Sequence, residues 1–322
     1  MEAVTDVVFR HVVARAGAPD VWFTEFTNAT GWAAAGDKAI GGRLVKTDDE
    51  NPIVAQLWGA NPEAMAKLSK HCADLGYHGI DINMGCPDSS ATKSGGGSAM
   101  IKNPENAAAM IAAAKTSGLP VSVKTRLGYS RIDEWRDWLT HILKQDVVNL
   151  TIHLRTKKEM SKVPAHFELI GEIKQLRDEI APQTLLTING DIRDRAHGME
   201  LVEKYGVDGV MIGRGIFHNP FAFVETQSGE TILSEETSAA RVSLGADARG
   251  ETRSEAVSEN NDSRDDVRTN KKHQLLDLLL LQLDLHDHYD QLMPRKFDPL
   301  KRFFKIYIRD FEGAAELRDK LM

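Results

Sequence analysis

A single thiol stands at the point where a short apolar segment meets a turn. Residues 79–87 read Gly-Ile-Asp-Ile-Asn-Met-Gly-Cys-Pro, which puts Cys86 just after the apolar part. Gly85 tolerates backbone angles that other residues avoid, and Pro87 cannot donate a hydrogen bond to a strand ladder, so the pair predicts a turn. A thiol on such a turn is expected to face a pocket. On these residues alone packing is an equal alternative, because free cysteine is among the most often buried residue types.

Polar side chains follow six predicted strands, at the point where each strand ends. In chain order they are Gln56, Asn83 with Cys86, Lys124 with Arg126, His153 with Arg155, Asn189-Gly190-Asp191, and Gly213-Arg214. The carboxyl ends of parallel strands meet at one mouth of a barrel, where enzymes of that architecture carry their catalytic groups. A lone histidine or glutamine there is more often a satisfied structural group than a ligand. Six such ends in succession favour a shared site.

The elements that must position these groups form an alternating pattern between residues 20 and 217. Short β-rich segments alternate with helical ones, which is typical of repeated βα units and a parallel sheet. Helices are expected at 7–16, at 62–75 and at 104–117, the last ending at Gly118. Strands are expected at 20–26, 52–58, 79–83, 120–125, 147–153, 184–189 and 209–212. These strands predict an α/β fold, a (β/α)₈ TIM barrel whose first strand is missing before the abrupt start at Met1.

The second half of the chain predicts two further parts. Residues 227–270 are rich in Ser, Glu, Thr, Asp, Arg and Asn and hold few large apolar residues, so burial cannot offset the entropy of ordering them. They are expected to be an acidic linker or insert. Residues 271–294 and 299–322 predict two helices separated by prolines. The expected domains are therefore a barrel at 1–226, the linker at 227–270 and a helical domain at 271–322.

Composition restricts the classes of function. The 322 residues carry a net charge of −7, but residues 225–270 hold 11 acidic and 5 basic residues, whereas residues 291–322 hold 8 basic and 5 acidic ones. Nucleic acid therefore remains a possible partner. With two cysteines and no apolar stretch near the roughly 20 residues of a membrane span, a cytoplasmic protein is expected. The histidines and cysteines form no pattern typical of a metal site.

The last two strand-end loops predict a phosphate site. The segments after Asn189 and after Gly213 contain glycine and precede helices, and such loops often bind phosphate through backbone N–H groups. Arg214 adds a charged donor, and Lys124 could hold an electron-rich ring atom. A phosphate at one edge, with an amide, a lysine and a histidine around a flat centre, suits flavin mononucleotide (FMN). No Gly-x-Gly-x-x-Gly dinucleotide fingerprint follows the first predicted strand.

The chain resembles the tRNA-dihydrouridine synthase family from Met1 to about Glu225 and again from about Gln274 to the end. The matching stretches, which together and in this order are highly specific, are residues 1–6 with Phe9-Arg10, 54–57, 81–87, 95–100, 123–126, 189–192, 211–215, and Tyr307 with 312–318.

The resemblance implies a flavin enzyme that reduces uridine in tRNA, with NADPH as reductant. Cys86 would be the acid that protonates C5 of the uracil after hydride reaches C6 from flavin N5, and the uridine would leave its stacked surroundings to react. The expected FMN contacts are Met1, Gln56, Lys124, His153, Asn189, Gly190, Asp191, Gly213 and Arg214. We expect a monomer that binds no metal.

The resemblance also favours contacts between tRNA and a set of basic residues. Lys301, Lys305 and Arg309 recur every four residues with Arg302 beside them, so one helix face is expected to be basic. A solvated basic face is the ordinary explanation, but the resemblance favours binding to the phosphate backbone. The full set of expected substrate contacts is Asn83, Lys93, Arg126, Arg155, Lys301, Arg302, Lys305 and Arg309.

Two other functions fit parts of the pattern. A flavin barrel acting on free pyrimidines, like dihydroorotate dehydrogenase, would share the strand-end groups but would not need the basic helix. A tRNA-binding protein without catalytic activity would need the helix but not the Cys86 thiol.

Overall fold

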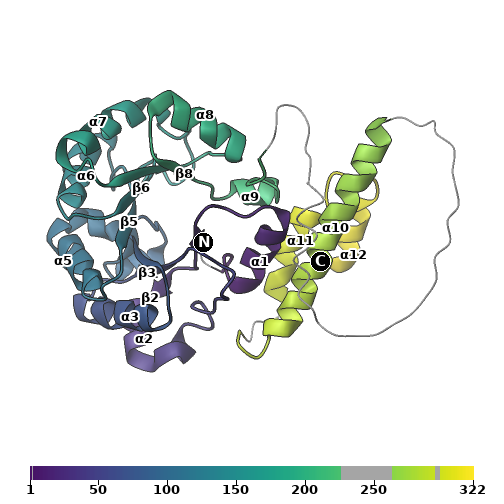
Figure 1. Cartoon of the computed structure of the whole chain (residues 1–322), viewed down its shortest axis with the longest axis horizontal. Coiled ribbons are helices and arrows are strands. Elements are labelled where there is room, and N and C mark those ends of the chain that lie inside the picture. The colour runs from purple at the N-terminus through teal and green to yellow at the C-terminus, as the bar shows by residue number, and fades with distance from the viewer. Residues whose placement is uncertain (2, 226–262, 294–297) are drawn as a thin grey trace, which may run out of the picture.

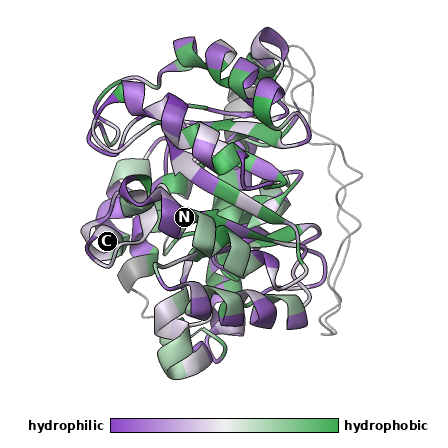
Figure 2. Ribbon diagram, turned by 90° about the vertical axis from the view of Figure 1, so that its left-hand side faces the viewer, coloured by the Kyte–Doolittle hydropathy of each residue, from purple (hydrophilic) through white to green (hydrophobic). Residues whose placement is uncertain are grey.

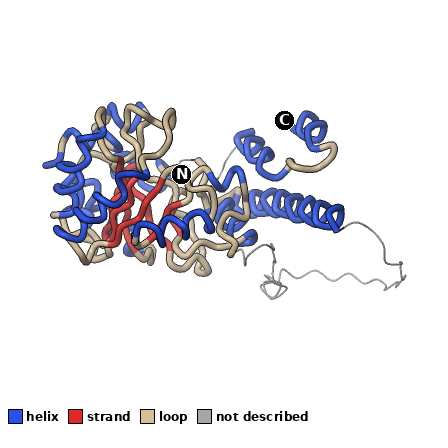
Figure 3. The backbone as a smooth tube through the Cα atoms, turned by 90° about the horizontal axis from the view of Figure 1, so that it is seen from above, coloured by secondary structure: helices blue, strands red, loops and turns tan. Residues whose placement is uncertain are grey.

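The computed structural model describes residues 1, 3–225, 263–293 and 298–322. A curled sheet surrounded by helices forms one part, and a group of C-terminal helices lies at its side (Figure 1). Seen from above, helices enclose the strands, and the C-terminal helices extend away from them (Figure 3).

All strand pairs in the sheet are parallel. The sheet follows the order β1-β3-β4-β5-β6-β7-β8, and β2 also pairs with β3. The strands are β1 (Trp22–Phe23), β2 (Thr27–Asn28), β3 (Ile53–Trp58), β4 (Gly79–Asn83), β5 (Val121–Arg126), β6 (Asn149–His153), β7 (Leu185–Asn189) and β8 (Gly209–Met211). Of the strand predicted at 20–26, only Trp22–Phe23 is a strand (β1); β2 lies just beyond that range, and both pair in sequence along the same edge of β3.

The ladder ends at β1 and β8. In the part of the chain that the structure describes, no strand joins these two ends, so seven strand positions curl into an incomplete barrel. A closed eight-stranded barrel would need one further strand position between these two edges. The α/β class, the parallel sheet and the C-terminal helices agree with the sequence prediction.

The helices around the sheet begin and end at recognisable signals. Asn61 and Asn103 cap two of them through side-chain oxygens, and proline occupies the first turn of both. The α-helices of this part are α1 (Val7–Ala16), α2 (Ala29–Ala35), α3 (Pro62–Asp74), α4 (Ser89–Lys93), α5 (Pro104–Lys115), α6 (Trp135–Leu143), α7 (Ile170–Ile180), α8 (Arg195–Tyr205) and α9 (Gly215–His218). Four 3₁₀ segments accompany them: η1 (Gly36–Ala39), η2 (Gly97–Lys102), η3 (Ile132–Glu134) and η4 (Phe167–Leu169).

The two faces of the sheet differ in polarity because side chains alternate along each strand. One face is apolar and fully buried, as with Ile80 and Ile82 on β4. The other face carries Gln56, Asp81 and Ser122, which lie opposite one another in register on β3, β4 and β5. Hydrophobic residues concentrate along the central strands in Figure 2. The interior of the barrel is thus partly polar, so it can hold hydrogen-bonding groups of a functional site.

The C-terminal helices differ in their bounds from the prediction. They are α10 (Ser263–Tyr289), α11 (Asp298–Tyr307) and α12 (Ala314–Leu321). α10 begins inside the segment expected to be a linker, whose residues 227–262 lie outside the described residues. The helix predicted over 299–322 is two helices, because Asp310 and Gly313 both have positive φ and break it.

The C-terminal helices pack against α1. Phe9 of α1 lies 5.3 Å from Phe303 of α11 and 6.3 Å from Phe217 of α9, measured between ring centroids. Tyr289 and Met293 pack with Val7 and Val8 in a second small core. Apolar packing therefore holds the C-terminal helices to the barrel.

Candidate active site

The Cys86 turn is held by hydrogen bonds from β4, β5 and η2. The side-chain oxygen of Asn83 accepts from the backbone N–H groups of Gly85 at 3.1 Å and Cys86 at 2.9 Å. The Arg126 guanidinium donates to the Gly85 carbonyl at 2.7 Å, and Ser98 N–H donates to the Cys86 carbonyl at 2.9 Å. Cys86 is half-buried and forms no disulfide. Its thiol is thus presented from a defined turn, as the sequence predicted.

The structure brings most of the predicted strand-end groups together. Sheet register places Asn83 opposite Lys124, Arg126 opposite His153, and His153 opposite Asn189. Asn83 donates to Gln56 at 3.3 Å, and Arg126 lies 3.5 Å from His153 Nδ1. Residues from β3 to β7 therefore line one mouth of the barrel, beside Cys86.

Positive charge dominates the electrostatics of this mouth. Burial, followed by the charges of Lys124, Arg126, Arg155 and Arg214, lowers the pKa of His153 to about 2. The imidazole is therefore neutral at physiological pH and can donate one hydrogen bond and accept another. Burial and then Arg126 lower the pKa of Lys124 to about 8, against the opposing effect of Asp81 and Cys86. Burial likewise lowers the pKa of Arg126 to about 10.

The loop after β7 forms one side of the mouth. Gly190 has φ +118°, a conformation that favours glycine, and Asp191 follows at +51°. The Asp191 carboxylate accepts from the Arg155 guanidinium and from Ala165 N–H, so it shapes the loop. Arg155 is 2% exposed, and its Nη1 atom has no hydrogen-bond partner in the described chain. A buried guanidinium with an unused donor is suited to an anionic or carbonyl acceptor.

Gly213 and Arg214 lie between β8 and α9. A Cβ at Gly215, the first residue of α9, would come within 2.5 Å of the Arg193 carbonyl, so this segment crosses the β7 loop closely. Arg214 is exposed, and its charge acts on His153, Arg126 and Asp191.

Met1 makes contacts within its own segment and with the core. Its ammonium donates to Thr5 Oγ1 at 2.6 Å, and its side chain packs on the hydrophobic core.

The residues expected to contact tRNA occupy different environments. Asn83, Arg126 and Arg155 are buried within the mouth, whereas Lys93, Arg302 and Lys305 are exposed. Arg309 lies beyond the end of α11, so the expectation of one helical face is wrong for it. It donates to the Phe217 carbonyl of α9 at 3.3 Å and pairs with Asp310. Lys301 donates to the Met322 carbonyl at 3.2 Å.

Sequence reasoning missed two interior residues, Asp81 and Ser122. Asp81 is fully buried between Ile80 and Ile82 and accepts hydrogen bonds from Ser122 Oγ at 2.6 Å and Gln56 Nε2 at 2.7 Å. The pKa of Asp81 is raised above its usual value, because the effect of burial is larger than the opposing effects of those hydrogen bonds and of the charge of Lys124. The available signal was a carboxylate in the middle of an otherwise apolar strand, where an ionisable residue is rarely buried without a role.

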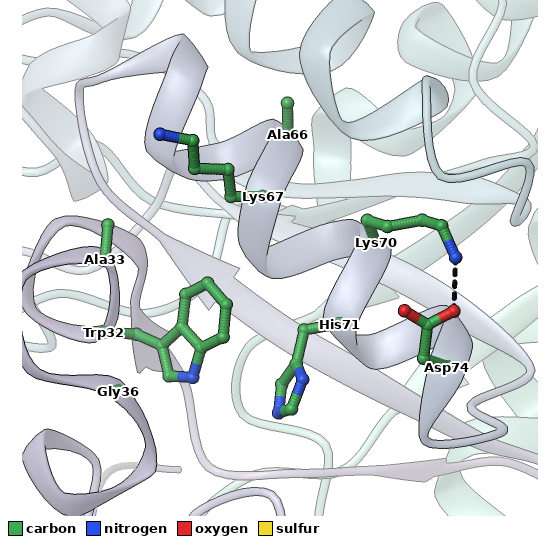
Figure 4. Close-up of a pocket in the computed structure, with 8 residues that line it drawn as sticks. All are labelled: Trp32, Ala33, Gly36, Ala66, Lys67, Lys70, His71 and Asp74. Atoms are coloured by element: carbon green, nitrogen blue, oxygen red, sulfur yellow. Dashed lines mark hydrogen bonds and ion pairs between the residues drawn. The ribbon is translucent and has the colours of Figure 1, made fainter.

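Two hollows occur on the surface near these elements. One, of about 410 Å³, reaches Cys86 and is lined by Phe26, Trp58 and Arg43 among others. The other, of about 730 Å³, lies between α2 and α3, where Trp32 and His71 face each other beside Lys67 and Lys70 (Figure 4). The second contains none of the predicted site residues, and its lysines are paired with Glu63 and Asp74. Of the two hollows, the one at Cys86 includes a predicted catalytic residue in its lining.

The described residues offer neither a metal centre nor a membrane span. Among them, no group of three or more His, Cys, Asp or Glu side chains could hold a metal ion. No helix in the same part of the chain is long and apolar enough to cross a membrane.

Comparison with known proteins identifies similar sequences along the whole chain. A family model described as dihydrouridine synthase (Dus) matches residues 1–275. A Bacillus subtilis (strain 168) protein named probable tRNA-dihydrouridine synthase 2 is 54% identical, and the match covers 100% of this chain and 87% of the relative. A probable tRNA-dihydrouridine synthase of Staphylococcus aureus (strain Mu50) is 51% identical over 100% of this chain and 86% of the relative.

Proposed function

Because the chain belongs to the dihydrouridine synthase family, we propose that it reduces uridine to dihydrouridine in tRNA, with FMN as cofactor and NADPH as reductant. The observation that supports this most directly is the convergence of Cys86, Lys124 and His153 at one mouth of a parallel sheet. The hollow that reaches Cys86 gives an extruded base a route to the thiol.

The residues present fit a flavin mononucleotide. Lys124 is surrounded by protein but forms no hydrogen bond within the described chain, so its ammonium is available to an electron-rich ring atom. Neutral His153 and the amide of Gln56 supply further donors and acceptors around a flat ring. Arg155 Nη1, the Asn189–Asp191 loop and Gly213-Arg214 would hold the phosphate end. We accordingly reassign buried Arg155 from tRNA binding to cofactor binding. The role of Met1 stays a prediction.

Cys86 supplies the proton in the proposed reaction. When bound in its reduced form, FMN would supply the hydride for C6 of the uracil. The electron pair of the C5=C6 bond then takes a proton from Cys86 Sγ at C5, which leaves a thiolate that regains its proton from solvent. Arg126 and Asn83 hold the turn that carries this thiol. Arg126 and Asn83 are themselves buried in the mouth, and their hydrogen bonds fix the backbone of Cys86.

The exposed basic residues form the proposed tRNA surface. Lys93 ends α4, next to the Cys86 turn, and Arg302 and Lys305 project from α11. They can pair with phosphates, whereas Arg309 instead ties the C-terminal helices to α9. We propose that the protein acts as a monomer in the cytoplasm, where its tRNA substrate is found.

A cysteine exchange tests the proposal. In a strain that lacks the gene, dihydrouridine in tRNA should be restored by the wild-type protein and by Cys72→Ala, whose thiol is buried in α3. Cys86→Ala should lower the rate of dihydrouridine formation at least ~100-fold, as expected for loss of a general acid. Equal restoration by Cys86→Ala would exclude the acid role. A wild-type protein that forms no dihydrouridine and binds no flavin would reject the function itself.

A further inference from the structure

We propose that Asp81 is a positioning residue that orients the Cys86 turn through the side chains of Gln56 and Asn83. This inference rests on the proposed function, since it concerns the acid of that reaction. It assigns a role to the carboxylate at the centre of β4.

The connection is a continuous series of hydrogen bonds. Gln56 Nε2 donates to Asp81 Oδ2 at 2.7 Å, and Asn83 Nδ2 donates to Gln56 Oε1 at 3.3 Å. The Asn83 oxygen then accepts from Cys86 N–H at 2.9 Å and from Gly85 N–H at 3.1 Å. Side-chain and backbone groups therefore link Asp81 without interruption to the residue that carries the thiol.

Every hydrogen bond in the series runs with its donor on the side nearer Cys86 and its acceptor on the side nearer Asp81. Asp81 fixes this donor-to-acceptor order at one end. Asp81 Oδ2 accepts from Gln56 Nε2, and a carboxyl oxygen that carries no proton can only accept hydrogen bonds, so Gln56 must turn its amide nitrogen toward Asp81 and its oxygen toward Asn83. Asn83 must then offer its nitrogen to Gln56, which leaves its oxygen for the two N–H groups of the turn. Those N–H groups, at the other end, require the same orientation. A neutral apolar residue at position 81 would leave Gln56 Nε2 buried without an acceptor and free to rotate.

Two observations show that Asp81 is built for this role rather than for packing. It is 0% exposed on an interior strand, where burying a carboxylate costs free energy unless it is hydrogen-bonded and balanced by charge. Ser122 Oγ, 2.6 Å away, donates to its other oxygen, and Lys124 on the neighbouring strand supplies opposite charge. The carboxylate is thus held in one orientation, and Gln56 is the partner that it directs.

Two variants at position 81 distinguish the effect of losing the hydrogen-bond acceptor from the effect of changing the size of the side chain. Asp81→Asn can still accept from Gln56 with its oxygen and donate to Ser122 with its nitrogen, so it should keep the series. Asp81→Leu has similar size but offers no acceptor. Thr187→Val is the matched control, because Thr187 Oγ1 donates to Asn149 at 2.8 Å on the polar face of the sheet, outside this series.

The first measurement uses the cofactor-free protein. Alkylation of Cys86 by iodoacetamide, followed by mass spectrometry, reports how the turn is held; Cys72 serves as an internal reference because burial raises the pKa of its thiol to about 12. Asp81→Leu should change the alkylation rate of Cys86 at least ~3-fold, whereas Asp81→Asn and Thr187→Val should match wild type.

The second measurement follows one turnover of the loaded enzyme. After chemical reduction of the flavin, tRNA should reoxidise it at least ~10-fold more slowly in Asp81→Leu, with Asp81→Asn within ~3-fold of wild type. Should Asp81→Leu not fold, Asp81→Ser, which is too short to reach Gln56, must meet the same two expectations.

If Cys86 alkylation and flavin reoxidation in Asp81→Leu or Asp81→Ser proceed at the wild-type rates, Asp81 does not position the Cys86 turn. A wild-type protein that reacts with iodoacetamide but never modifies tRNA would instead count against the proposed function. The two failures are therefore distinguishable.

Discussion

Gly97 lies directly against the backbone of Cys86. A Cβ at Gly97 would come within 2.7 Å of the Cys86 carbonyl oxygen and 3.3 Å of the Cys86 Cβ, and Gly97 has φ +55°. Gly97, the last glycine of segment 95–97, therefore forms the wall behind the Cys86 turn. A side chain at position 97 must move either the wall or the cysteine.

Gly97→Ala should lower both stability and dihydrouridine formation. The positive φ and the clash with the Cys86 carbonyl together predict a loss of roughly 1–3 kcal/mol in the free energy of unfolding. Urea unfolding measures this loss, and a tRNA modification assay should show a fall of at least ~10-fold. Gly171→Ala on α7 is the control, because nothing lies within 4 Å of its added Cβ. A Gly97→Ala protein as active as that control would show that the wall can shift without moving the thiol.

Lys124 should make FMN binding depend on pH. Its pKa of about 8 means that the ammonium form predominates below that pH and disappears as the pH rises through it. If FMN binds the protonated form, its affinity should be constant below pH 7 and fall by up to ~10-fold per pH unit above about 8. Fluorescence titration of FMN at pH 6–9.5 measures this. Lys124→Met should bind FMN more weakly and without this dependence, and a variant that retains the wild-type profile would assign the titration to another group.

Arg302 and Lys305 should contribute to tRNA affinity in a salt-dependent manner. Both are exposed on α11, so their replacement by glutamate removes two cations from the proposed tRNA surface. Filter binding at several salt concentrations should show weaker binding, and the slope of log affinity against log salt should become shallower by roughly 1 for each phosphate that the protein no longer neutralises. Lys204→Glu, at the C-terminal end of α8, should leave the slope unchanged. If the variant with both replacements binds tRNA as tightly as the wild type, the tRNA-binding surface does not include Arg302 and Lys305.

The sequence predicted the elements with local signals better than those whose bounds depend on tertiary packing. β4 and α1 have the predicted bounds, because an apolar segment ending in Asn-Met-Gly-Cys-Pro and an amphipathic decapeptide are local signals. The break between β1 and β2 and the end of α11 depend on tertiary packing and on positive φ at Asp310, which no short pattern reveals.

Three of the arginines expected to contact tRNA have hydrogen-bond partners within the protein that the sequence does not reveal. Arg126, Arg155 and Arg309 look alike as strand-end or helical cations, yet the structure directs each of them to backbone carbonyls or to an aspartate. Asp81 was missed for the converse reason: within an apolar strand, its function depends on Gln56, a residue 25 positions away that only the sheet register brings beside it.

The packing of Phe9 has a consequence for how a uridine is chosen. Because Phe9 contacts α9 through Phe217 and α11 through Phe303, these aromatic contacts fix the basic residues of α11 relative to the barrel. Under the proposed tRNA contacts, the separation between a phosphate held by α11 and the Cys86 thiol would set which uridine of the bound tRNA reaches the thiol. Enlarging or trimming those three rings would alter which nucleotide reaches the thiol, without any change at the thiol itself.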